Sequence, residues 1–230
     1  MTKLHAARAA AAAAAVGVLI AVPAAAAFGG GPATEPQSPP AATADHRQQA
    51  QPFRTGAAAY ELGETLANLE GRSLEVTFLA GIIPHHQSAL VMAKLELARG
   101  TDPDLRTHAE NIIANQQHQI DQFTRWLQQW YGLTPQQAQA AAPLEAQQEM
   151  AAMDRETKQM IQRLRDTPRG KKFDIAFVRS IIPHHNSGII EFLEPQARAS
   201  HPQLRVAAAT GSTTQQAEIA DFRTWLGGRR

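Results

Sequence analysis

Two pairs of adjacent histidines are the residues in this 230-residue sequence whose type and spacing best suit chemistry: His85–His86 and His184–His185. Each pair directly follows the tripeptide Ile-Ile-Pro. Neutral imidazole is a common protein ligand for copper and zinc. The chain contains no cysteine, which excludes thiolate zinc sites, iron–sulfur clusters and disulfides. A metal site in this protein must therefore use His, Met, carboxylate or amide ligands.

A further donor follows each pair two helical turns later. Met92 stands seven residues after His85, and Glu191 stands seven residues after His184. In a helix this spacing places each donor on the same face as its histidine. The predicted metal ligands are thus His85, His86 and Met92 in one set, and His184, His185 and Glu191 in the other. Thioether with imidazole suits Cu(I), whereas imidazole with carboxylate suits Cu²⁺ or Zn²⁺.

The two histidine pairs belong to an internal repeat. Residues 71–127 align without a gap to residues 170–226, with 20 identities over 57 positions. A match of this length and identity indicates a tandem duplication, in which each copy is one structural unit.

The elements that position the histidines are predicted to be helices, because helix-forming residues dominate beyond residue 55 and strand-like alternation is scarce. In the first repeat, one helix is expected from Ser73 to Gly100 and a second from Pro103 to Gly132. Shorter helices are expected at residues 57–70 and 144–165. Two hairpins with apolar faces can pack together, so the sequence predicts an all-α four-helix bundle with linker helices alongside.

Proline precedes both histidine pairs inside otherwise helical runs. Pro84 and Pro183 cannot donate a backbone hydrogen bond, and each leaves the carbonyl four residues earlier without its usual donor. We therefore expect each helix to kink or restart at its proline.

A buried amide recurs opposite the histidines. Gln116 interrupts the apolar stripe of the second helix, and Gln215 occupies the same place in the second repeat. Because a buried amide needs a partner, pairing with histidine across the hairpin is the simplest expectation. Glu218, one turn after Gln215, is a further supporting residue. The same pattern also fits a structural interpretation, in which the histidines are core residues that hold no metal.

The predicted linker helix carries three methionines on one stripe: Met150, Met153 and Met160. Such a stripe is typical of core packing, although thioethers could also supply soft metal ligands. Both interpretations stay open from the sequence.

The first residues have the pattern of a secretory signal peptide, with basic residues, an apolar run and small residues up to Ala27. A retained membrane anchor is the alternative. The predicted organisation is a signal peptide at 1–27, a Pro/Ala-rich tether at 28–55, a first repeat at 56–132, a linker helix at 133–169 and a second repeat at 170–230. A secreted or periplasmic protein, free of the membrane after cleavage, follows from this pattern.

Composition and motifs exclude several functions. The net charge is +1 and no long run of Lys or Arg occurs, so nucleic-acid binding is not expected. Neither a Ser/His/Asp nucleophile motif nor a Gly-rich phosphate loop is present. A di-iron oxidase uses Glu-x-x-His motifs, which neither repeat contains. We therefore expect no enzyme, with metal ions as partners and self-association left open.

The strings FLAGIIPHHQSALVMAKLELARG and FVRSIIPHHNSGIIEFL resemble the family called domain of unknown function 305. The resemblance implies a ferritin-like helical bundle, export from the cytoplasm and, in some members, copper binding linked to metal tolerance. Methionines frequent in the family are replaced here by four apolar residues and a carboxylate: Ile82, Ile181, Phe123, Phe222 and Glu191. The resemblance implies metal buffering or tolerance with copper as the ion, and the loss of soft thioether ligands makes zinc the alternative.

Overall fold

The computed structural model describes residues 54–228, and within this range every regular element is a helix. The helices are α2 (Ala57–Ala67), α3 (Gly71–Arg99), α4 (Pro103–Tyr131), α5 (Pro135–Ala141), α6 (Leu144–Asp166), α7 (Lys171–Arg198) and α8 (Pro202–Gly227). The predicted all-α bundle is confirmed. The predicted signal peptide and nearly all of the tether lie outside the described residues.

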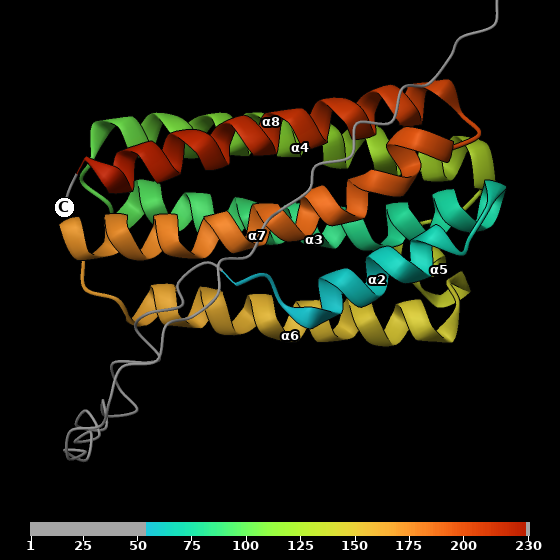
Figure 1. The fold of residues 1–230 in the computed structure, drawn as a ribbon, viewed down its shortest axis with the longest axis horizontal. Coiled ribbons are helices and arrows are strands. Elements are labelled where there is room, and N and C mark those ends of the chain that lie inside the picture. Colours follow the sequence, from blue (N-terminus) through green and yellow to red (C-terminus); the bar gives the residue numbers. More distant parts are fainter. Residues whose placement is uncertain (1–53, 229–230) are drawn as a thin grey trace, which may run out of the picture. The chain divides into compact units, whose positions relative to one another are not determined.

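The helices form three layers (Figure 1). The long helices α3 and α7 pack against each other in the middle layer, and each also packs against its hairpin partner, α4 or α8. On the opposite side, α2 and α6 form a third layer, with α5 beside α3. The two hairpins therefore join through their first helices, and the linker helix covers that central pair.

Local chemistry sets the helix ends. Asp102 is the N-cap of α4, where its side chain accepts hydrogen bonds from two backbone amides of the first turn. Gly132 ends α4 with a left-handed φ of 68°, a conformation that favours glycine. Thr134 and Gln137 then form a capping box that starts α5. Helix α5 was not predicted from the sequence, although this Thr-Pro-Gln-Gln segment carries a recognisable start signal.

The sequence predicted that each proline-containing helix kinks or restarts; neither helix restarts, because α3 and α7 each run through their proline. Pro84 does leave the carbonyl of Ala80 without its usual donor, as the sequence indicated. The side chain of Gln139 in α5 donates to this carbonyl at 3.3 Å. A neighbouring helix therefore supplies the hydrogen bond that Pro84 cannot make.

The core consists of two apolar clusters. The first apolar cluster includes Phe78, Phe123 and Phe192, and the second includes Phe173, Phe177 and Phe222. Because the two clusters use opposite ends of the antiparallel helices, the polar residues in mid-helix form a layer between them. By length and hydropathy α3 could cross a membrane, but 78% of its most apolar window is buried inside the bundle, as is typical of a core helix.

Candidate metal centre

The two histidine pairs meet in the layer between the apolar clusters. The imidazole rings of His85 and His184, which lie 99 residues apart, are stacked with centroids 3.9 Å apart. The neighbouring rings of His86 and His185 lie about 6 Å from them. None of the four side chains belongs to a residue more than 7% exposed. The two predicted histidine sets therefore form one continuous layer rather than two separate sites.

The hydrogen bonds of the central pair fix where each ring holds its proton. His85 Nε2 donates to the carbonyl oxygen of His184 at 3.1 Å. The hydroxyl of Ser88 donates to the carbonyl of His85, so its oxygen is left to accept from His184 Nε2 at 2.7 Å. Both rings thus carry their proton on Nε2. Each Nδ1 keeps a free lone pair and has no hydrogen-bond partner.

The outer pair contacts the second helix of each hairpin. His86 Nε2 donates to the amide oxygen of Gln119 at 2.9 Å. His185 Nε2 lies 2.7 Å from Glu218 Oε2 as an ion-pair contact, without the geometry of a directed hydrogen bond. Gln119 and Glu218 occupy equivalent positions in the two repeats. The Nδ1 atoms of both outer histidines also lack a partner.

The predicted pairing of histidine with Gln116 or Gln215 was wrong. Gln116 Oε1 and both amide atoms of Gln215 are buried without a hydrogen-bond partner. The amide that bonds to histidine is Gln119, less than one helical turn farther along α4. Its signal in the sequence was its alignment with Glu218, the residue of α8 that contacts His185. Ser88, which orders the central pair, was also missed as a functional residue.

Burial sets the protonation of the layer. It lowers the pKa of His85 and of His184 well below 6.5, and it lowers the pKa of His86 to about 3 although the bond to Gln119 opposes this shift. These three imidazoles are therefore neutral at pH 7, the form that binds metal. Burial also raises the pKa of Glu191 to about 8. Glu191 Oε1 has no hydrogen-bond partner and lies 3.9 Å from His85 Nε2.

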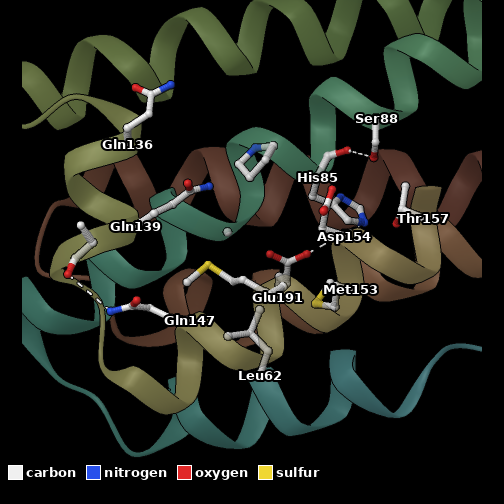
Figure 2. A pocket seen from close by; sticks show the side chains of 15 residues that line it. Leu62, His85, Ser88, Gln136, Gln139, Gln147, Met153, Asp154, Thr157 and Glu191 are labelled. Carbon is white, nitrogen blue, oxygen red and sulfur yellow. Dashed lines mark hydrogen bonds and ion pairs between the residues drawn. The ribbon is translucent and has the colours of Figure 1, made fainter.

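The layer can be approached from two sides. A groove of about 740 Å³ between α4 and α8 is lined by Gln116, Gln119, Gln215 and Glu218. On the opposite side, a cavity of about 580 Å³ is lined by His85 and Glu191 (Figure 2). An ion could therefore reach the histidines without passing through either apolar cluster.

The structure brings together most of the predicted ligands, but it separates Met92 from them. Met92 is fully buried in the second apolar cluster and does not line the cavity that His85 and Glu191 share. Within residues 54–228, no three His, Asp or Glu side chains converge closely enough to hold a metal ion as they stand. The layer thus offers the neutral imidazoles of His85, His86 and His184, together with His185 and the carboxyl groups of Glu191 and Glu218.

A purely structural role leaves this layer incompletely bonded. Four buried Nδ1 atoms and one Glu191 oxygen have no partner. A buried polar atom left unpaired costs about 1 to 3 kcal/mol. Unpaired imidazole nitrogens and carboxyl oxygens are donors of the type that metal ions bind, so the chemistry of these residues fits a metal ion.

Several solved structures have a fold similar to that of this chain. The silver-bound form of CopM obtained by co-crystallization is 26% identical, with a TM-score of 0.52, covering 67% of this chain and 96% of CopM. The silver-soaked form is 25% identical, with a TM-score of 0.52 and coverage of 67% and 95%. A DUF305 protein from Streptomyces coelicolor, described as secreted, is 22% identical, with a TM-score of 0.55 and coverage of 67% and 93%.

No protein of curated function matches the sequence significantly. The sequence profile of the domain of unknown function DUF305 matches residues 34–226, which is most of the chain. The motif and the fold agree with that match, and the chain belongs to the DUF305 family.

Proposed function

We propose that this protein binds a metal ion outside the cytoplasm, with copper as the physiological ion, and serves in metal buffering or tolerance. The proposed ligands come from the histidine layer and its two carboxyl groups: His85, His86, His184, His185, Glu191 and Glu218. The observation that carries the proposal is the set of four buried Nδ1 atoms without partners.

Two further observations support this function. CopM, which is 25–26% identical in its silver-bound forms, has the same helical arrangement, and silver and Cu(I) are both soft monovalent ions. The N-terminal sequence pattern supports an extracytoplasmic location. Because Glu191 and Glu218 are harder donors than thioethers, Cu²⁺ and Zn²⁺ also suit parts of this layer.

The experiment that tests the function is metal titration of the purified protein by calorimetry with Cu(I), Cu²⁺ and Zn²⁺. Changing both His85 and His184 to Ala should weaken binding of the preferred ion at least tenfold, because the central lone pairs are lost. The matched control is His118→Ala, since His118 is exposed on α4.

This double variant distinguishes a metal-binding role of the histidines from a purely structural role. A structural layer predicts unchanged metal binding and a large loss of thermal stability. A metal centre predicts lost binding while far-UV circular dichroism still reports a folded helical protein. Unchanged affinity in the double variant would contradict the proposed function.

A further inference from the structure

The cavity of about 580 Å³ beside the histidine layer has one wall formed by residues that are not among the proposed metal ligands. One side is formed by His85 of α3 and Glu191 of α7, and the opposite side is formed by α6 (Figure 2). The linker helix contributes two thioethers to this wall, those of Met150 and Met153. Thioether sulfur is neutral, needs no deprotonation and favours soft ions.

Met150 and Glu191 converge over a glycine of α3. A Cβ atom at Gly81 would lie 3.0 Å from Glu191 Oε2 and 3.4 Å from the sulfur of Met150. Because glycine has no side chain, the carboxyl group and the thioether can share this space. Glu191 Oε1 in turn lies 3.9 Å from His85 Nε2. Thioether, carboxyl and imidazole groups therefore meet in one cavity.

Met153 lies close to one turn after Met150, on the same face of α6, and is 8% exposed. Met153 belongs to the first apolar cluster and Met150 packs against it. The other two methionines in the described part of the chain contact the second cluster and do not line the cavity. Met92 lies within the second apolar cluster, and Met160, also on α6, packs against it. All three methionines of α6 therefore take part in core packing, but Met150 and Met153 also line the cavity that His85 and Glu191 share.

The donor count also points to sulfur. Across the described residues, His, Asp and Glu side chains alone form no group of three that could hold a metal ion. In this cavity, His85 and Glu191 provide two such donors, whereas Asp154, which also lines it, is half-exposed and forms an ion pair with Lys158. The thioethers of α6 would raise that number to a complete set of three or four.

We propose that Met150 and Met153 complete a metal site with His85 and Glu191 in this cavity and set its preference for Cu(I) and Ag(I) over Zn²⁺. This inference rests on the proposed metal-binding function and names the residues that decide its selectivity. The linker helix is then part of the site as well as a cover for the central helix pair.

The direct test uses methyl spectra of the purified protein with ¹³C-labelled methionine methyl groups, recorded with and without silver nitrate. Silver binding should shift the resonances of Met150 and Met153 and leave those of Met92 and Met160 in place. Assignments follow from single Met→Leu variants, which keep the volume of the side chain.

Affinity measurements on the same variants provide the second test. Met150→Leu combined with Met153→Leu should weaken Ag(I) and Cu(I) binding at least tenfold and change Zn²⁺ binding by less than about twofold. Met160→Leu, on the same helix, is the control and should change none of the three affinities.

Each outcome decides the inference. Wild-type protein that binds silver while the double variant binds it equally well would overturn the role of these thioethers and leave the histidine layer as the metal centre. A shift of the Met92 resonance in their place would also overturn it. Wild-type protein that takes up neither silver nor copper would overturn this inference together with the proposed function.

Discussion

At the scale of single residues, burial keeps three imidazoles in the neutral form, which is the form that can bind metal. It lowers the pKa of His85, His184 and His86, so that these rings are neutral at physiological pH. Hydrogen bonds to the His184 carbonyl and to Ser88 then place the protons of the central rings on Nε2. The free lone pairs are thereby directed to Nδ1, and no proton must leave these rings when metal binds.

Another buried group, the carboxyl of Glu96, is unfavourable to ionise in the folded protein. Glu96 is fully buried beside the carboxyl group of Asp174. Burial, then repulsion from Asp174 and a side-chain hydrogen-bond interaction with it, and then repulsion from Asp102 raise its pKa to about 8, although Arg106 opposes the shift. Between pH 4.5 and 8 the folded protein therefore holds a proton that the unfolded chain releases, so the free energy of unfolding should fall as pH rises through this window.

We expect Glu96→Gln to stabilise the protein at pH 9 by on the order of 2 to 4 kcal/mol and to have little effect at pH 4. Urea unfolding across this pH range measures the effect. Glu110→Gln, at an exposed position of α4, is the control and should leave the pH dependence unchanged. Parallel pH curves for wild type and Glu96→Gln would show that Glu96 ionises normally in the folded protein.

At the scale of elements, the continuity of α3 depends on a contact outside the helix. Pro84 supplies no backbone donor, and Gln139 of α5 donates to the Ala80 carbonyl instead. Gln139→Ala should lower the free energy of unfolding by about 0.5 to 1.5 kcal/mol. In a Pro84→Ala background the same change should cost much less, because residue 84 can then donate to Ala80 itself.

A double-mutant cycle by urea unfolding measures this coupling. Gln136→Ala, exposed on the same short helix, controls for general effects on α5. Equal losses from Gln139→Ala in both backgrounds would mean that the hydrogen bond to Ala80 does not compensate for the proline.

The helix boundaries were predictable where capping residues mark them in the sequence. Asp102 with Pro103 starts α4, and Gly132 ends it, as the sequence indicated. The layer arrangement was not predictable, because an apolar stripe on α6 does not specify which helices it covers. For the same reason the sequence could not show whether Gln116 or Gln119 bonds to histidine. The two amides lie within one turn of α4, and only the packing of the hairpin determines which of them reaches a ring.

At the scale of the whole molecule, the histidine layer joins parts that are far apart in the sequence. Its central pair comes from α3 and α7, and its outer contacts reach α4 and α8. The first and second apolar clusters close the layer at its two ends. The sequence predicted these ligands in two sets, but packing of the middle helices places the histidines in one layer.

An ion bound in this layer would therefore stabilise both hairpins together. Binding to the folded state alone adds about 2.7 kcal/mol to the free energy of unfolding when the free ion is 100 times its dissociation constant. For a chain of this size that corresponds to a rise in Tm of about 5 to 10 °C. We expect silver in chloride-free buffer to raise the Tm of the wild-type protein by this amount, in a single cooperative transition followed by circular dichroism.

The variant His85→Ala with His184→Ala should lose this rise, whereas His118→Ala should keep it. The comparison also corrects for silver bound to the unfolded chain, because unfolded wild type and the two variants retain several other histidines in common, and such binding lowers the apparent gain. An equal change of Tm in wild type and the double variant would mean that the ion binds elsewhere. A rise confined to one of two separate transitions would mean that the ion stabilises one hairpin alone and does not link the two.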